Sequence, residues 1–153
     1  MRFKNKLLSV LSIMVLFVAS SFILESNAYA DSSIIPTNEI ENHDFEAGNL
    51  TGWTVVSGNA FTNTNVCSDG TFNRNGLNHL LGYRGCGDDP KGVLKSSNFI
   101  VGGNGIIDFL MAGGSDIDNL YVALVRTTDG TELFKATGYE SEEYQRVCWN
   151  AKN

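Results

Sequence analysis

The sequence predicts an all-β protein whose strands stack as a two-layer sandwich. Short extended runs, rich in branched and aromatic residues, recur along the chain between turn signals about every ten residues. No segment after residue 30 keeps a helical hydrophobic period. Glycine is frequent and proline rare, with 16 and 2 residues, which suits many tight turns between uninterrupted strands.

The segment 105–126 gives the strongest strand pattern. Two apolar runs, 106–111 and 120–125, flank a polar loop at 112–119. Alternate residues of the second run are apolar on both faces, so we expect it to lie inside the sandwich. The loop carries Asp116 and Asp118 at the end of this strand pair, which is where we expect recognition.

The remaining strands are expected wherever short apolar runs lie between Gly-, Asn- or Asp-rich turns. Their ranges are 40–45, 53–56, 60–64, 79–83, 92–94, 97–101, 132–137 and 144–150. Asp129-Gly130 lies between two such runs, and Asp-Gly is a strong hairpin signal. The polar stretches 65–78 and 84–90 are expected to be loops.

The N-terminus predicts a secretory signal peptide. Basic residues at positions 2, 4 and 6 precede an apolar run over 7–24, and Ala28-Tyr29-Ala30 has the small-residue pattern of a cleavage site. We therefore expect a signal peptide at 1–30, a linker at 31–37 and one domain at 38–153 in a secreted, extracellular or wall-associated protein. The alternative for the apolar run is a retained membrane anchor.

The processed chain is strongly acidic. Without Arg2, Lys4, Lys6 and Glu25, the totals of 11 basic and 17 acidic side chains become 8 and 16, a net charge of −8. This sign repels phosphate backbones, which argues against nucleic acid as a partner. Neutral hydroxylated ligands or a hard cation suit such a surface better.

The cysteines are odd in number. In an exported chain a bridge between Cys67 and Cys86 would close a Gly- and Asn-rich loop. Cys148, next to Trp149 in an expected strand, is predicted to be a buried free thiol.

Several motifs resemble a known family over nearly all of the processed chain. The run DFEAGNLTGW, residues 44–53, resembles the opening motif of jelly-roll carbohydrate-binding modules. The segments that resemble one particular family more specifically are residues 78–80 with Gly82, 96–99, 103–109, 113–116 and 119–126. Together they look like the galactose-binding-like sandwich module, the family 66 fructan-binding module, attached to levanase-type enzymes of glycoside hydrolase family 32.

The resemblance implies a jelly-roll β-sandwich that binds fructan, such as levan, without cleaving it. Members of the family commonly have an aromatic residue where this sequence has Leu81. They also continue into a terminal strand bearing paired aspartates, whereas this sequence stops after the run 144–150. We therefore expect a module without its last strand, from the N-terminus of a larger fructan hydrolase whose catalytic domain is not in this chain.

A structural calcium ion is the cofactor that the resemblance suggests. Asp44 and Glu46 bracket Phe45, and strand alternation would turn both acids to the same side. Calcium takes about six to eight oxygen ligands, so these two residues would supply only part of a site. The alternative is a pair of solvated acids on an edge strand.

Two polar groups are candidates for binding a neutral polysaccharide. The first is the loop pair Asp116 and Asp118, whose carboxylates can accept hydrogen bonds from hydroxyls, with Arg126 within reach. The alternative for the two acids is turn capping, and for Arg126 a weak surface ion pair. The second group consists of His79, Tyr83, Arg84 and Asp88. The guanidinium group of Arg84 can donate to sugar oxygens, and the ring of Tyr83 can stack on a sugar. A structural role is the alternative for His79.

Catalytic motifs are missing from the sequence. No nucleophile elbow or His-Glu metal motif occurs, and the glycine run 102–105 leads into an expected strand rather than a helix. We therefore expect a noncatalytic sugar-binding module. The alternatives are a fragment of a fructan-hydrolysing enzyme and a cell-surface structural or adhesion domain.

Overall fold

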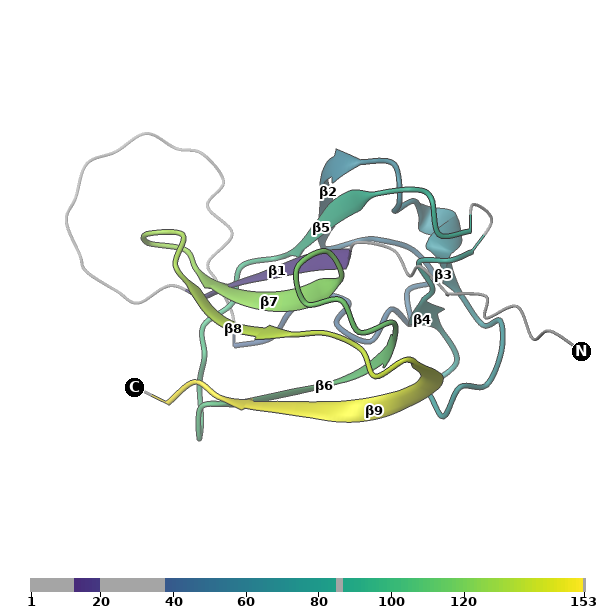
Figure 1. Ribbon diagram of the computed structural model, residues 1–153. Helices are drawn as coiled ribbons and strands as arrows, with labels where there is room; N and C mark the ends of the chain where they lie inside the picture. Colours follow the sequence, from purple (N-terminus) through teal and green to yellow (C-terminus); the bar gives the residue numbers. More distant parts are fainter. Residues whose placement is uncertain (1–12, 20–37, 85–86, 153) are drawn as a thin grey trace, which may run out of the picture.

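The computed structural model describes residues 13–19 (backbone), 38–84 and 87–152 (Figure 1). These parts of the chain form an all-β structure with one short 3₁₀ turn, η1 (Asn63–Asn65). The strands are β1 (Ile13–Ala19), β2 (Trp53–Gly58), β3 (Val66–Cys67), β4 (His79–Leu80), β5 (Gly92–Ser96), β6 (Ile106–Gly113), β7 (Tyr121–Arg126), β8 (Glu132–Ala136) and β9 (Ser141–Asn150). None of these parts contains a helix long and apolar enough to cross a membrane.

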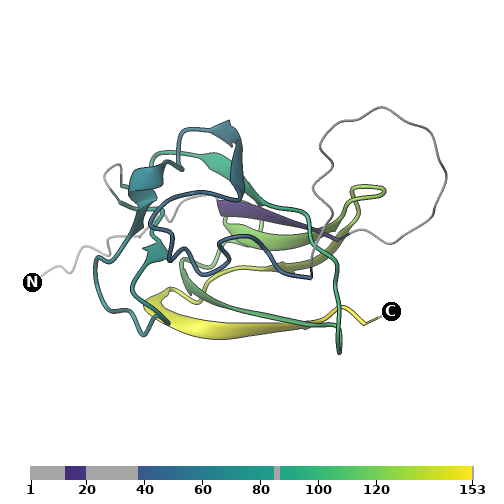
Figure 2. The same ribbon diagram turned by 180° about the vertical axis from the view of Figure 1, so that it is seen from behind.

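The strands form two layers and a small side ribbon. One layer is a five-stranded sheet in the order β2-β5-β1-β7-β8, and the other is the antiparallel pair β6–β9. Both ribbon views place the β6–β9 pair beneath the larger sheet, with the β3–β4 ribbon at one end (Figures 1 and 2). This arrangement confirms the sandwich-like all-β class.

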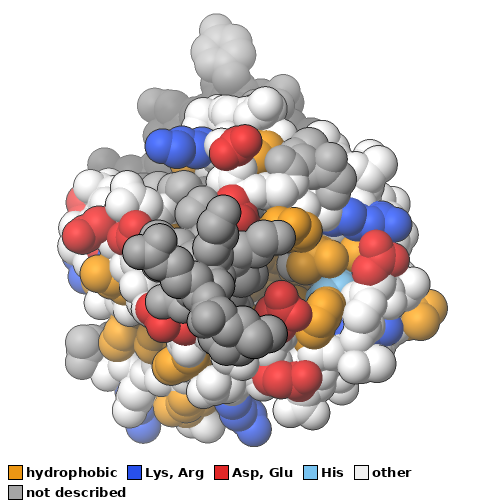
Figure 3. All heavy atoms as spheres, turned by 45° about the vertical axis from the view of Figure 1, so that its right-hand side comes forward, with side chains coloured by type: hydrophobic (Ala, Val, Ile, Leu, Met, Phe, Trp, Pro, Cys, Tyr) orange, Lys and Arg blue, Asp and Glu red, His pale blue; other side chains and the backbone are white. Residues whose placement is uncertain are grey.

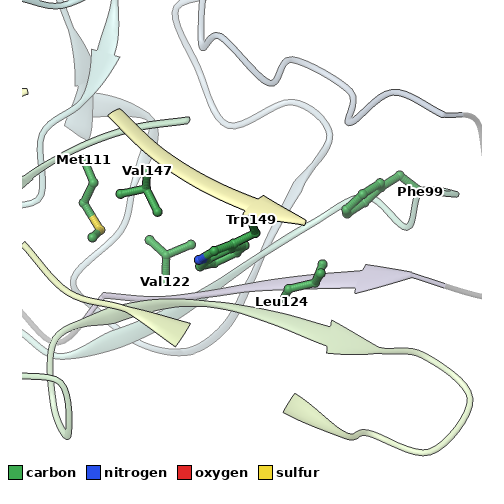
Figure 4. Packing of buried hydrophobic residues seen from close by; sticks show 6 residues of the cluster. All are labelled: Phe99, Met111, Val122, Leu124, Val147 and Trp149. Atoms are coloured by element: carbon green, nitrogen blue, oxygen red, sulfur yellow. The ribbon is translucent and has the colours of Figure 1, made fainter. Parts of the chain in front are cut away.

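The main core lies between the two layers and centres on Trp149 of β9 (Figure 4). Its ring stacks on Phe134 of β8 at 5.6 Å between centroids and meets Phe109 of β6 edge-on at 4.8 Å. Buried aromatic pairs contribute packing energy beyond the area they remove from water. Val122 and Leu124 of β7 close this core from the opposite sheet, so Trp149 links the two layers directly.

The two strands of 105–126 form as expected but do not pair with each other. β6 pairs with β9, whereas β7 pairs with β1 and β8. β7 is buried on both faces: Val122 and Leu124 point into the main core, and Ala123 and Val125 form a separate cluster on the other side. The expectation of an interior strand is confirmed, and residues 114–120 connect one layer to the other.

The hairpin at Asp129-Gly130 is also confirmed. The amide of Gly130 donates to the Arg126 carbonyl, and that of Arg126 to the Thr131 carbonyl, which joins β7 to β8. Gly130 has a φ of +73°, a conformation that glycine adopts without a side-chain penalty.

Three expected strands are wrong. Residues 97–101 follow the end of β5 and form no strand beyond an isolated bridge at Phe99. Residues 40–45 form turns, because Asn42 and Phe45 have positive φ values of 50° and 60°. The Asn42 side chain holds these turns through the carbonyls of Asn49 and Thr51 and the amide of Ala47. Residues 60–64 contain the start of η1 rather than a strand. Apolar residues in these segments pack through loops, which a period-two pattern does not separate from strands.

Part of the expected signal peptide contributes to the sheet. Ile13–Ala19 is β1, the central strand, in parallel register with β5 and β7. The apolar run was expected to lie outside the fold, and the structure differs because an apolar segment can pair with any strand edges left open to it. Cleavage after residue 30 stays a prediction.

Candidate functional site

A cleft of about 730 Å³ opens between the layers at the end that carries β4. Figure 3 views this side, where a histidine lies beside hydrophobic side chains with acidic and basic groups around them. The cleft is lined by aromatic residues, Phe45, Trp53, Phe109 and Tyr144, and by polar ones, His43, Asp44, Arg74, Asn75, Asn78, His79, Asp108 and Arg146, with apolar neighbours from β6 and β7. Such a mixture is typical of ligand sites.

The centre of the cleft is a contact between β4 and β9. His79 Nδ1 and the Tyr144 hydroxyl are 2.8 Å apart, and their rings meet edge-on at 5.7 Å. Tyr144 lies where β9 departs from regular pairing with β6, between the partners of Met111 and Gly113. A bulge can redirect a side chain, which explains why Tyr144 contacts His79 rather than following the alternation of Val147 and Trp149.

Burial sets the ionisation of both groups. It raises the pKa of Tyr144 to about 12, an effect that nearby Cys67 supports and Arg74 opposes, so the hydroxyl stays protonated. Burial also lowers the pKa of His79, and the positive charge of Arg74 lowers it further. The backbone and the carboxylate of Asp69 act in the opposite direction and raise it. The pair is therefore neutral near pH 7.

Two polar atoms of the cleft, His79 Nε2 and Arg74 Nε, are buried without a hydrogen bond of regular geometry among the described residues, although the Asp69 backbone lies close enough to the His79 ring to raise its pKa. His79 as a whole is only 6% exposed. If Nδ1 accepts from Tyr144, Nε2 carries a proton and needs an acceptor; in the other tautomer it needs a donor. Buried polar atoms are rarely left unpaired in proteins, so both atoms indicate a place for a ligand or water.

The loop 74–78 that borders the cleft is held by Glu46. Its carboxylate oxygen Oε1 accepts the amides of Leu77 and Asn78 at 2.8 and 2.7 Å. Gly76 has a φ of +78°, and a Cβ there would lie 2.5 Å from the same oxygen. This glycine lets the backbone approach the carboxylate and fixes Asn78 next to His79.

Aromatic rings form another wall. Phe45 and Trp53 stack with centroids 4.9 Å apart and an interplanar angle of 27°. The Trp53 indole donates to the Asn42 carbonyl at 3.1 Å, which ties the ring to the opening turns. The positive φ of Phe45 and this stacking place its ring over β2 rather than in a sheet.

In the expected loop site, the carboxylate of Asp116 is satisfied within the loop, and Asp118 is exposed. Asp116 Oδ1 accepts the amides of Asp118 and Asn119 at 3.1 and 3.2 Å, and Oδ2 accepts the Asn119 side chain at 2.9 Å. The Asn119 side chain, followed by these backbone amides, lowers the pKa of Asp116. Arg126 pairs with Asp129 at 2.9 Å rather than with the two acids. Neither acid lines the cleft, and the contacts are those of a capped turn.

The second expected group is brought together only in part. His79 lines the cleft, whereas Tyr83, Arg84 and Asp88 do not. Arg84 donates to Asp69 at 2.8 Å and to the Thr64 carbonyl at 2.6 Å, which are structural contacts. Tyr83 is 56% exposed. Asp88 has a buried Oδ1 without a partner among the described residues.

The placement of Asp44 and Glu46 does not fit the calcium expectation. Because 40–45 is not a strand, alternation does not apply; Glu46 turns to the loop amides, and Asp44 accepts the amide of Glu46 at 3.1 Å. No group of three or more His, Cys, Asp or Glu side chains in the described residues could hold a metal ion.

The cysteine expectations have different outcomes. Cys67 is buried at β3, and Cys86 lies outside the described residues, so the bridge stays a prediction. Cys148 is a free thiol as expected, but the expectation that it is buried is wrong, since it is exposed. Val147 and Trp149 are the buried residues of this part of β9, and alternation turns Cys148 to the other face.

Sequence reasoning missed Arg74, Asn78 and Tyr144 as parts of the site. Arg74 and Asn78 lay in a stretch assigned as loop, and Tyr144 in an expected strand. Tyr144 and His79 are 65 residues apart, so only folding places them together. Comparisons of the chain with protein-family models, with curated proteins and with solved structures find no match.

Proposed function

We propose that this chain is a secreted, noncatalytic carbohydrate-binding domain whose ligand enters the cleft at His79 and Tyr144. The observation that carries the proposal is the pair of buried, unpartnered polar atoms, His79 Nε2 and Arg74 Nε, in a cleft walled by aromatic rings. A sugar offers a partner for both kinds of group in this cleft, the unpaired polar atoms and the aromatic rings. Its hydroxyls donate and accept hydrogen bonds, and its C–H faces pack on aromatic rings.

The polar groups favour a neutral ligand. Tyr144 and His79 are uncharged near neutral pH, and the guanidinium group of Arg74 and the carboxylate of Asp44 contribute charges of both signs to the lining. A charged ligand would leave one of these charges opposed by a like charge at close range. Uncharged hydroxyls can form hydrogen bonds with both the guanidinium group and the carboxylate.

The resemblance noted above extends the proposal to fructan as the ligand and to the jelly-roll type as the fold. Binding would raise the local substrate concentration for a tethered fructan hydrolase, with no reaction in this chain. Secretion follows from the predicted signal peptide. Calcium at Asp44 and Glu46 stays a prediction of the resemblance and is separate from this proposal.

The test is affinity electrophoresis of the full-length chain in gels containing levan, inulin or an unrelated glucan. Retardation by a fructan is expected, with loss in His79→Ala and Arg74→Ala. Asp118→Asn is the matched control, because Asp118 is an exposed acid outside the cleft. Equal migration in every gel would refute sugar binding, and loss of retardation in Asp118→Asn alone would move the site to the 116–119 loop.

A further inference from the structure

One edge of β6 forms a long wall of the cleft. Six consecutive residues of this strand, 107–112, line it. Strand alternation turns successive side chains to opposite faces, so a wall made of consecutive residues is the edge of the strand rather than one of its faces. In the part of the chain that the structure describes, β6 pairs only with β9. The edge turned away from β9 therefore faces the cleft, and both ribbon views show the opening turns, residues 40–45, running above β6 (Figures 1 and 2).

The pairing of β6 with β9 determines which backbone groups this edge presents. The amide of Ala151 donates to the Gly105 carbonyl at 2.8 Å, which makes these two a hydrogen-bonded pair of the ladder. Bonded and non-bonded pairs alternate along an antiparallel ladder. Every second residue of β6, starting at Ile107, therefore bonds to β9. The N–H and C=O groups of Asp108 and Leu110 point the other way, and no backbone hydrogen bond of the described residues outside this ladder uses them.

The cleft therefore holds two sets of polar groups without regular hydrogen bonds. His79 Nε2 and Arg74 Nε lie at one end, because Tyr144, which contacts His79, comes from the part of β9 opposite the end of β6. The backbone groups of the β6 edge continue from there along the strand. Residues 107–112 span about 17 Å at about 3.4 Å per residue. One sugar ring is shorter than this edge, so a single ring covers only part of a cleft of about 730 Å³.

We propose that the cleft binds an extended segment of a sugar chain, several units long, that lies along the free edge of β6. This inference rests on the proposed function and adds the length and the direction of the ligand. Hydroxyls of successive units bond to the N–H and C=O groups of Asp108 and Leu110, and a unit at the end of the segment reaches His79 and Arg74. Backbone groups of a paired strand are already fixed, so binding them costs little conformational entropy.

An extended peptide is the other ligand that a strand edge can take. An added strand bonds to the edge through its own N–H and C=O groups, which alternate between two opposite edges. It brings no regular hydrogen-bonding group to the side-chain atoms of His79 and Arg74. Hydroxyls project in several directions from each sugar unit and can donate or accept, so a sugar chain provides partners for both sets.

The first test measures amide hydrogen exchange of the full-length chain with fructose, with levan oligosaccharides of two, four and six units, and with a blocked peptide of alternating threonine and valine. Oligosaccharides of four or more units should slow exchange at the Asp108 and Leu110 amides at least tenfold, and fructose should not. The amides of Ile107 and Phe109 point to β9 and are the matched controls. Their exchange should stay within twofold with every ligand.

The second test measures dissociation constants over the same series of sugars. The constant should fall at least tenfold between fructose and the four-unit oligosaccharide. Leu110→Pro removes an N–H group on the cleft side without removing a ladder bond to β9, a position where a strand tolerates proline. It should weaken binding of the four-unit oligosaccharide at least fivefold and leave fructose binding within twofold. If this variant does not fold, the exchange measurement decides alone.

The outcomes separate this inference from the proposed function. Equal affinity for fructose and for the longer sugars, or binding that leaves exchange at Asp108 and Leu110 unchanged, would overturn the extended mode while sugar binding itself stands. Protection of these two amides by the peptide and not by the sugars would also overturn it and would assign the edge to a polypeptide. Binding of none of the sugars would refute the proposed function and this inference together.

Discussion

Two acidic side chains of this molecule, in different regions, each accept hydrogen bonds from two backbone amides, but with different structural consequences. Asp116 accepts the amides of residues two and three positions ahead, and Glu46 accepts amides 31 and 32 positions ahead. The first closes a turn that is complete in itself. The second ties the opening turns to the loop beside His79, where polar atoms remain unpaired. A carboxylate in a loop therefore indicates a site only when tertiary contacts leave neighbouring groups unsatisfied.

The largest expected difference between the two regions is in ligand binding. His79→Ala should weaken fructan binding at least tenfold, about 1.4 kcal/mol, because it removes both the unpaired Nε2 and the partner of Tyr144. Asp116→Asn should leave the dissociation constant within about twofold, since Asp116 lies outside the cleft. Isothermal titration with levan measures both. A larger loss in Asp116→Asn would reverse the assignment.

The second difference is in stability. Glu46→Ala should lower the free energy of unfolding by about 1 kcal/mol, because two charge-assisted hydrogen bonds across a long loop are lost at an exposed position. Asp116→Ala should have a smaller effect, since local turn contacts also form in the unfolded chain. Urea unfolding of the two variants gives the comparison. Equal losses would show that sequence distance does not matter here.

The pH dependence separates the regions further. The pKa of His79 is lowered in the folded state from its usual value of 6.5, so below that pH the unfolded state takes up the proton first. Stability should fall as the pH drops through 6.5, until the folded pKa is passed. His79→Gln should flatten the fall in this range. A fall of unchanged slope in this variant would assign the titration to another group.

The pKa of Asp116 is also lowered, so its protonation likewise makes stability fall as the pH drops, but in a lower pH range. Its contribution to stability is present above the usual value of 3.8 and is lost as the pH falls through the folded pKa. Asp116→Asn should therefore change the melting temperature at pH 7 more than at pH 2. The control is His79→Gln, whose stability relative to the parent chain should change as the pH falls below 6.5 and then stay level once the folded pKa of His79 is passed.

The smallest expected effect is that of calcium. Asp44 and Glu46 are committed to backbone amides, so millimolar calcium or a chelator should leave the melting temperature unchanged within about 1 °C. A site filled at 100 times its dissociation constant would add about 2.7 kcal/mol and be visible as a clear shift. Such a shift would show that these acids can rearrange into a metal site.

Alternation of apolar residues was sufficient to predict most strands. The runs at 53–56, 92–94, 106–111, 120–125, 132–137 and 144–150 all fall on strands, and Asp129-Gly130 forms the predicted hairpin. These patterns are local, because the period of a strand and the backbone angles of a turn depend on neighbouring residues alone. The prediction failed at 40–45, where Asn42 and its side-chain hydrogen bonds stabilise turns.

The sequence by itself determined the all-β class, the interior position of β7 and the acidic character of the chain. Only the tertiary structure decided that β6 and β7 belong to different sheets, that β1 lies between β5 and β7, and that Tyr144 meets His79. The physical reason is that these pairings join segments tens of residues apart. Their choice depends on which edges and apolar surfaces remain to be covered once the local elements have formed.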